Sequence, residues 1–406
     1  MLESNTTPCR CLPLVIVEGF LGRTGSIVWG HFENYLNKDC LGCKRKIIFS
    51  SVGPVSSLHD RACELYYSLV GGTVDYGEEH SAVHGHAQYG RTTQGLYPQW
   101  SSENPLHFLG HSIGGPTIVK LQYLLKQGFF SSRAHPDWIR SVNTISSPFR
   151  GTQAVYILGE CTESAPRVRS CSPGSIIARG IHIISYLSPI LPRALDLHTE
   201  SRRMSFHDIN VLSLLKQLWK SDWAESFDCC PYDVSFTAAD EREAIGEGEP
   251  YPGTFYRSCA TYMTQKVGGG NAHSISFTSS MLLSPMLFMA RAIGSFDFST
   301  IRPVPSFLRS GDGKEQDLIN RQNNLPEEYR ANDGVVPLFS QWHPFPCSST
   351  HCQHSKGPPA PGIWIVEQWN ETTHLSLVPL WISSSPQKRY WLELGCWLRG
   401  IEMVKT

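Results

Sequence analysis

The chain has 406 residues, with 35 Lys and Arg side chains against 36 Asp and Glu, so its formal net charge is −1 when histidine is neutral. This balance gives no electrostatic reason to expect binding to nucleic acid or to an anionic membrane surface. Because 41% of the residues are hydrophobic and only 17% are charged, the composition excludes a largely disordered chain and predicts a sizeable packed core.

Short apolar runs alternate with helical patterns along the chain, which predicts an α/β fold with a mostly parallel central sheet and helices on both faces. Strands are expected at 12–17, 46–50, 106–109, 138–145, 254–260 and 362–366. Helices are expected at 60–70, from 114 to about 126, and at 388–398. No run of 18 or more apolar residues occurs, so the sequence predicts no transmembrane segment.

Two features favour a cytoplasmic location. Glu3 stands where a secretory signal carries positive charge, and the first apolar run is shorter than the hydrophobic region of such a signal. The 13 cysteines are odd in number and scattered, which is more typical of reduced thiols than of a disulfide framework.

We interpret residues 1–406 as one domain with a core over about 12–150 and 326–404. The stretch of about 151–325 is too long for an ordinary connection between a strand and a helix, so it is predicted to be an insertion with structure of its own.

Within this insertion, residues 176–197 are unusually apolar but are interrupted by Gly180, Pro189 and Pro192. Two interpretations stay open: a helix of the core, or a hinged lid over an apolar cleft.

Gly110-His-Ser-Ile-Gly114 is a Gly-x-Ser-x-Gly pattern between an expected strand and an expected amphipathic helix. A serine at such a turn projects its hydroxyl above the sheet, and the glycines leave room for the backbone. Ser112 is therefore a candidate nucleophile. The backbone N–H of Ile113 is a candidate donor to an oxyanion, and Phe20, in the loop after the first strand, is placed to supply the second donor.

A serine hydroxyl needs a base, and the base needs a carboxylate that orients it. After this kind of turn, the acid and then the histidine follow on loops after later strands. Asp333 in Asn332-Asp-Gly-Val-Val-Pro337 and His374 in Thr372-Thr-His-Leu375 satisfy that order. The competing histidines belong to a Pro- and Ser-rich stretch that is expected to be an exposed loop: His343, His351 and His354.

Other segments closely resemble the staphylococcal and thermoalkalophilic Bacillus lipase family. The most specific is the run from Leu69-Val-Gly-Gly-Thr-Val-Asp-Tyr-Gly77 to Tyr89-Gly-Arg-Thr92, and the likeness covers about 12–399. It is strong to residue 147 and patchy through the insertion. The resemblance implies an α/β-hydrolase triacylglycerol lipase with this triad and these oxyanion donors: Ser112, Asp333, His374, Phe20 and Ile113.

The same resemblance implies a structural zinc ion held by two aspartates and two histidines, at Asp60, His80, His86 and Asp233. Two imidazoles and two carboxylates complete a four-ligand set without an open position, which suits a structural ion. Such an ion would join a zinc-binding insertion at about 55–95 to the lid-bearing insertion. Spacing alone favours His80 with His84, one helical turn apart, so the choice of His86 comes from the resemblance.

The sequence departs from the family pattern in three places. Glu18 stands where the family usually has histidine, beside the first oxyanion loop, and Ile113 replaces the usual glutamine, which does not affect a backbone donor. Ser376 replaces a glutamate of the family's calcium site, and residues 379–381 supply no carboxylate, so calcium is not expected.

A second cluster of potential metal ligands lies outside the family pattern: His343, Cys347, His351, Cys352 and His354. It could ligate a second metal ion, but its spacing matches no known metal module. An exposed loop is the favoured interpretation.

The leading hypothesis is a triacylglycerol lipase that hydrolyses lipid esters through an acyl-enzyme and makes transient contact with a lipid interface. One alternative is an intracellular esterase or acyl hydrolase of smaller soluble esters. The other is a catalytically inactive, zinc-stabilised scaffold in which Glu18 spoils the oxyanion loop. The sequence does not determine acyl-chain preference or oligomeric state.

Overall fold

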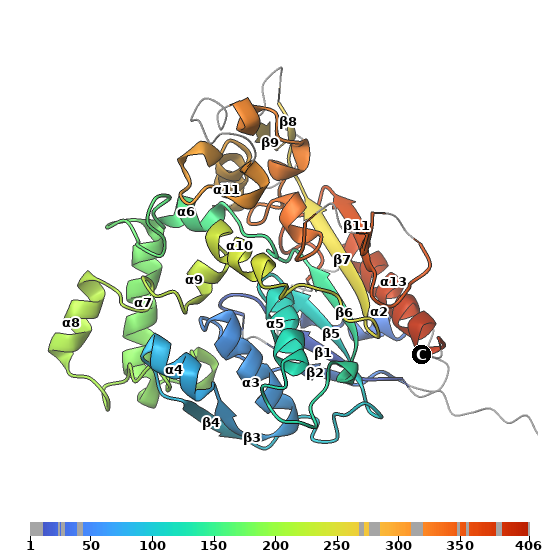
Figure 1. Ribbon diagram of the computed structural model, residues 1–406, viewed down its shortest axis with the longest axis horizontal. Coiled ribbons are helices and arrows are strands. Elements are labelled where there is room, and N and C mark those ends of the chain that lie inside the picture. The colour runs from blue at the N-terminus through green and yellow to red at the C-terminus, as the bar shows by residue number, and fades with distance from the viewer. Residues whose placement is uncertain are drawn as a thin grey trace, which may run out of the picture.

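The centre of the molecule is a seven-stranded sheet with strand order β10-β11-β7-β6-β5-β1-β2, in which every neighbouring pair is parallel (Figure 1). The computed structural model describes residues 11–22, 25, 29–38, 44–267, 272–275, 285–309, 320–346, 350–354, 357–378 and 384–404. The strands of the sheet are β1 Leu14–Val17, β2 Ile47–Phe49, β5 Leu106–His111, β6 Ile139–Ile145, β7 Phe255–Tyr262, β10 Cys352–Gln353 and β11 Trp364–Asn370.

Two small antiparallel pairs lie outside this sheet: β3 Gly72–Asp75 with β4 Tyr89–Thr93, and β8 Gln265–Lys266 with β9 His273–Ser274. The α-helices are α2 Glu33–Leu36, α3 Leu58–Val70, α4 Glu78–His84, α5 Gly114–Lys126, α6 Ala154–Leu158, α7 Pro173–Leu187, α8 Val211–Trp219, α9 Cys230–Asp233, α10 Phe236–Ala244, α11 Pro285–Gly294 and α13 Ser385–Glu402. The 3-10 helices are Pro136–Trp138, Ser188–Ile190, Arg193–Leu195, Phe298–Thr300, Ser306–Leu308, Glu327–Tyr329 and Leu338–Gln341 (η7).

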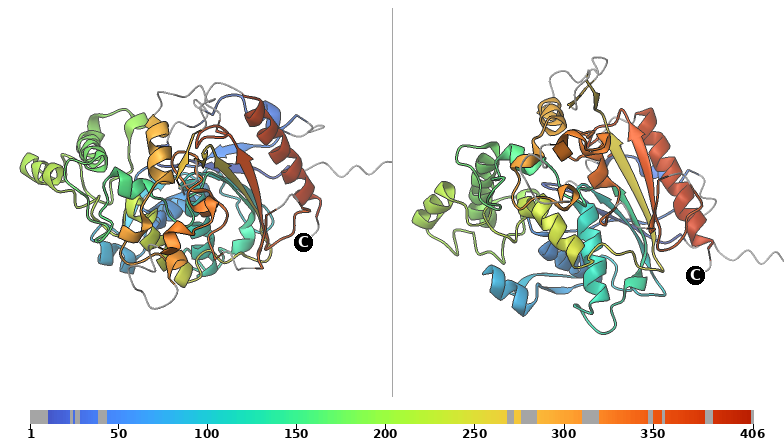
Figure 2. Two further views of the ribbon diagram at one scale, coloured as in Figure 1. Left: turned by 90° about the horizontal axis from the view of Figure 1, so that it is seen from above. Right: turned by 45° about the horizontal axis from the view of Figure 1, so that its top comes forward.

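Helices cover both faces of the sheet. Strand β1 is continuously apolar because it is buried on both of these faces. All four of its residues are buried, with Val15 and Val17 in the core cluster that includes α3 and α5. Leu14 and Ile16 point to the opposite face, where α2 and α13 pack (Figure 2). A strand buried on both sides has no solvent-facing position, so polar residues do not alternate with apolar ones.

The predicted α/β fold with a mostly parallel sheet and helices on both faces is confirmed. The predicted strands and helices are all present, with boundaries that move by a few residues. The segment 151–325 contains β7, which pairs with β6 and β11 in the middle of the sheet. Helices α6 to α10 therefore precede β7, and α11 follows it.

The apolar segment at 176–197 contains most of α7, which ends at Leu187, followed by short 3-10 turns. Ser172 caps this helix by accepting a hydrogen bond from the Ser175 N–H. Ala178 and Ile181 are buried, whereas Ile176 and Ile183 are exposed. The helix is therefore amphipathic, and it packs away from the central sheet, in a separate cluster made mostly of residues that precede β7 (Figure 1). Within the described ranges, no helix is both long and apolar enough to cross a membrane.

Candidate active site and metal centre

The backbone turn at Ser112 joins the end of β5 to the start of α5. Ser112 has φ +55, a left-handed conformation that costs free energy for a residue with a side chain. A Cβ at Gly110 would lie 2.4 Å from the Gly115 nitrogen, and one at Gly114 would lie 2.1 Å from the Val17 oxygen. Only glycine fits at both places, which gives the Gly-x-Ser-x-Gly pattern a steric reason here.

Ser112 and His374 line the same pocket, together with the loop that follows β1. A Cβ at Gly19 in that loop would lie only 2.7 Å from the Ser112 Cβ, so the loop passes directly over the serine. The loop after β1 and His374 are far apart in the sequence, and both lie beside Ser112.

Asp333 and His374 are joined by a hydrogen bond of 2.9 Å between Asp333 Oδ2 and His374 Nδ1. The backbone N–H of His374 also donates to the Asp333 carbonyl at 2.9 Å. Because a carboxylate accepts, Nδ1 carries a proton and Nε2 is left to act as a base toward the pocket.

Asp333 is fully buried, and its carboxylate is held by several further donors. Oδ1 accepts from the backbone N–H groups of Val335 and Val336 at 2.9 and 2.8 Å. Oδ2 also accepts from the Thr261 hydroxyl at 3.0 Å. A buried carboxylate with this many donors stays oriented, so it can fix the His374 ring.

His111, directly before Ser112, supports His374 from the sheet side. Its Nε2 donates to the His374 carbonyl at 3.0 Å. Burial lowers the pKa of His111 to about 3, so this ring is neutral and adds no charge to the pocket.

The loop that carries Phe20 is braced by the buried guanidinium of Arg61. This side chain donates to the carbonyls of Glu18 and Gly53 at 2.5 and 2.6 Å, and to the Thr117 hydroxyl at 2.9 Å. It thereby ties the loops after β1 and β2 to α5. Ile113 lies at the N-terminal end of α5, where backbone N–H groups have no partner within the helix and can serve an oxyanion.

Glu18 accepts a hydrogen bond of 2.9 Å from the indole N–H of Trp29. Its carboxylate is thus held by a neutral donor while it lines the pocket beside Ser112.

A second, largely apolar pocket begins at Ser112 and extends under the segment before β7. Its lining includes Ile113, Val155, Ile177, Trp223 and Val335. Glu160 also lines this pocket, and burial raises the pKa of its carboxyl to about 8. A pocket of this kind accepts an apolar chain and presents its head to Ser112.

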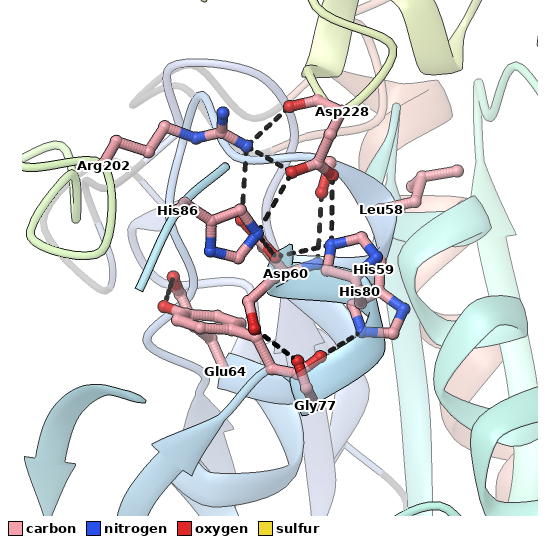
Figure 3. Close-up of polar contacts among 12 residues, drawn as sticks. Leu58, His59, Asp60, Glu64, Gly77, His80, His86, Arg202 and Asp228 are labelled. Carbon is pink, nitrogen blue, oxygen red and sulfur yellow. Dashed lines mark hydrogen bonds and ion pairs between the residues drawn. The ribbon is translucent and has the colours of Figure 1, made fainter. Parts of the chain in front are cut away.

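Four side chains outside this pocket converge on one point: Asp60 on α3, His80 on α4, His86 after α4, and Asp228 (Figure 3). His80 Nε2 lies 3.3 Å from Asp60 Oδ1 and 3.4 Å from Asp228 Oδ1. His86 Nε2 lies 3.4 Å from Asp228 Oδ2 and 3.7 Å from Asp60 Oδ1.

These residues fit a metal ion because several of their polar atoms are buried without hydrogen bonds. Asp60 Oδ1 and the Nε2 atoms of His80 and His86 have no hydrogen-bond partner among the described residues. His86 directs Nδ1 to the Ala87 carbonyl at 2.9 Å, which leaves Nε2 as the ligand atom. Burial and the neighbouring Asp228 raise the pKa of Asp60, as expected for two buried carboxylates that lie close together.

The structure corrects the predicted ligand set, because Asp233 is not part of this group. The Asp233 carboxylate accepts a hydrogen bond of 2.7 Å from the Leu58 N–H at the start of α3, and Asp228 occupies the fourth position. Both aspartates lie in the same short segment, and no local pattern distinguishes them. His84, which spacing alone favoured, lies on α4 beside His80 and outside the four-residue group.

Of the positions that correspond to the family's calcium ligands, Ser376 is described, and its hydroxyl accepts from the Thr373 N–H at 2.8 Å. Residues 379–381 lie outside the described residues.

The chain is similar to known lipases. Residues 11–168 match the family model described as lipase-like, C-terminal domain. The lipase of Staphylococcus hyicus is 33% identical over 84% of this chain and 54% of its own length. Lipase 2 of Staphylococcus aureus strain MRSA252 is 26% identical over 93% of this chain and 52% of its own length.

The crystal structure of Staphylococcus hyicus lipase has the same fold. The superposition covers 99% of both chains with a TM-score of 0.73, and 23% of the aligned residues are identical.

The parallel sheet and the strand–Ser112–helix turn define an α/β hydrolase. The sequence relationships place the chain in the staphylococcal-type lipase family. The chain spans about half the length of these relatives.

Proposed function

We propose that the protein is a carboxylic-ester hydrolase of the triacylglycerol lipase type, in which Ser112, His374 and Asp333 act in series. The observation that carries this proposal is the 2.9 Å hydrogen bond between His374 and Asp333 beside a pocket that Ser112 also lines. The relationship to staphylococcal lipases supports the reaction class.

In the proposed reaction, His374 Nε2 accepts the Ser112 hydroxyl proton while the serine oxygen attacks the ester carbonyl. The backbone N–H groups of Phe20 and Ile113 stabilise the negative charge on the carbonyl oxygen. The same His374 nitrogen then donates its proton to the leaving alcohol. Water, deprotonated by His374, releases the carboxylic acid from the acylated serine.

Asp333 has two roles in this scheme. Its carboxylate keeps the proton of His374 on Nδ1, and its negative charge stabilises the imidazolium that forms after proton transfer. The donors on Asp333 prevent it from turning away during the cycle.

The surface of the segment before β7 favours a lipid substrate over a small soluble ester. On α8, Val211, Leu212, Leu215 and Trp219 are all exposed, and Trp219 is 89% exposed. Exposed apolar side chains on an amphipathic helix bind a lipid–water interface, and Lys216 on the same helix adds positive charge. We propose that this segment contacts the lipid surface and that the pocket beneath α7 receives the acyl chain.

We also propose that Asp60, His80, His86 and Asp228 hold a structural zinc ion. The ion would supply a cross-link between the α3–α4 region and the segment that leads into α9. Arg202, which donates to Asp228 at 2.6 Å and lies 3.4 Å from Asp60, would orient the two carboxylates.

The test is hydrolysis of p-nitrophenyl esters of increasing chain length and of long-chain triacylglycerol emulsions. We expect activity on emulsions, labelling by a fluorophosphonate probe, and loss of both in Ser112→Ala. Ser295→Ala, at an exposed serine on the surface, serves as the matched control.

Each alternative has its own outcome in this experiment. Activity on short esters without activity on emulsions would identify a soluble esterase. Absence of both labelling and hydrolysis in the wild-type protein would identify an inactive scaffold and overturn the proposal.

A further inference from the structure

A second cluster of potential metal ligands lies at the edge of the sheet, away from the Asp60 group. It consists of His343, just after η7, Cys352 on β10, and His354, just after β10. One potential ligand atom from each lies within 4.8 Å of the others. Cys347 and residues 348–349 lie outside the described residues.

His343 was expected in an exposed loop, but it is fully buried. Its Nδ1 lies 2.9 Å from the Phe345 carbonyl, and because a carbonyl only accepts, Nδ1 is the protonated nitrogen. Its Nε2 is buried and has no hydrogen-bond partner among the described residues. A buried nitrogen that stays unpaired destabilises the folded chain, and binding a metal would satisfy it.

The other two residues are positioned by different contacts. Cys352 is in register with Trp364 of β11, so its backbone position is set by the sheet. The His354 ring packs edge-on against Trp342 at 4.6 Å and lies 5.9 Å from the His343 ring. His354 is exposed, so its ring can rotate toward the other two.

We propose that His343, Cys352 and His354 form a second metal site that takes Zn²⁺. Two imidazoles and one thiolate are ligands that Zn²⁺ prefers and that Mg²⁺ and Ca²⁺ do not. The three ligand atoms lie within 4.8 Å of one another, and a tetrahedral Zn²⁺ ion would hold them about 3.3 to 3.6 Å apart, so a small rotation of the exposed His354 ring is needed to bind it. Binding releases the thiol proton of Cys352, and a water molecule fills the fourth position.

This ion would tie the end of η7 to the sheet edge. In η7, the Gln341 amide donates to the carbonyls of Thr261 and Val336 at 2.9 and 3.1 Å. These carbonyls belong to β7 and to the loop that carries Asp333. The second ion would therefore stabilise the support of that loop, whatever reaction the loop serves.

Absorption spectra of bound Co²⁺ distinguish the two proposed metal sites, because only one of them has a thiolate ligand. The full-length chain is stripped with a chelator, reduced, and titrated anaerobically with Co²⁺. We expect two equivalents of Co²⁺ to bind. Only one of them should produce a near-ultraviolet thiolate-to-cobalt charge-transfer band. Asp228→Asn should remove the other equivalent and leave this band.

The variants decide whether the band comes from the proposed ligands. Cys352→Ser should abolish it, and His354→Asn should weaken Co²⁺ binding at this site by roughly tenfold or more. Cys171→Ser, at an exposed cysteine elsewhere, should leave it unchanged. Folding is checked by near-ultraviolet circular dichroism, and if Cys352→Ser does not fold, His354→Asn at its exposed position decides.

Three results would overturn the proposal: no charge-transfer band in the wild-type chain, a band that survives in folded Cys352→Ser, or unchanged binding in His354→Asn.

Discussion

The Ser112 pocket and the Asp60 cluster both contain buried charge, but they satisfy it differently. Around Asp333, both carboxylate oxygens accept hydrogen bonds from the protein itself. In the Asp60 cluster, an aspartate oxygen and two imidazole nitrogens face one another without hydrogen bonds. The first arrangement is complete as the chain folds, whereas the second leaves three ligand atoms available to the proposed metal ion. Damage to the pocket should therefore affect activity, and damage to the cluster should affect stability.

His374→Ala should produce the largest effect and confine it to activity. Removing the base of such a triad lowers kcat on the order of 10⁶-fold. The free energy of unfolding should change little, because the backbone hydrogen bond from residue 374 to Asp333 remains. Ester hydrolysis and urea unfolding measure the two effects. A variant with near wild-type activity would exclude the proposed triad.

Removal of metal should produce the opposite pattern in the Asp60 cluster. At free Zn²⁺ about 1,000 times the Kd, chelation should lower the free energy of unfolding by about 4 kcal/mol. Asp228→Asn should abolish most of that metal-dependent difference. Asp233→Asn is the matched control, because Asp233 caps α3 and should leave the metal dependence intact. If Asp233→Asn removed the metal dependence and Asp228→Asn did not, the ligand assignment would be wrong.

Arg61→Met should affect both properties, because Arg61 connects the pocket loops to the core. It would leave the buried carbonyls of Glu18 and Gly53 without donors, which costs about 3 kcal/mol in total. The kcat should fall as well, since the Phe20 loop loses its brace. Arg140→Met is the control, because Arg140 also donates to carbonyls but near the end of the described chain. Equal losses in the two variants would argue against a specific role for Arg61.

Glu160→Gln should have the smallest effect, and that effect should depend on pH. Burial raises the pKa of this carboxyl to about 8, above its unfolded value, so the folded state binds the proton more tightly. Unfolding free energy should therefore decrease as pH rises from about 5 to 9, and glutamine should remove on the order of 2 kcal/mol of that decrease between pH 6 and 9. Urea unfolding at the two pH values measures it. Parallel pH profiles for both proteins would show that Glu160 ionises freely.

The elements that the sequence predicted correctly are those with strong local patterns. The run at 12–17 contains β1, the run at 106–109 begins β5, and the helix after Gly114 ends at Lys126 as expected. The antiparallel pair of β3 and β4 was not predicted, because its residues are mostly exposed or half-buried and lack an apolar alternation.

The candidate sites show which features the local sequence patterns could not predict. Asp333 and His374 were chosen from chain order, and the structure joins them through a hydrogen bond. Asp228 and Asp233 could not be separated, because each is defined by a partner more than a hundred residues away in the chain.

The sequence by itself determined the sharp turn at Ser112 and the buried strands, because backbone sterics and apolar runs act over a few residues. Only the tertiary structure decided which aspartate joins the Asp60 cluster and that His343 is buried with a nitrogen that has no hydrogen-bond partner among the described residues. Those outcomes depend on contacts between segments that are far apart in the chain, and a short stretch of sequence does not determine such contacts.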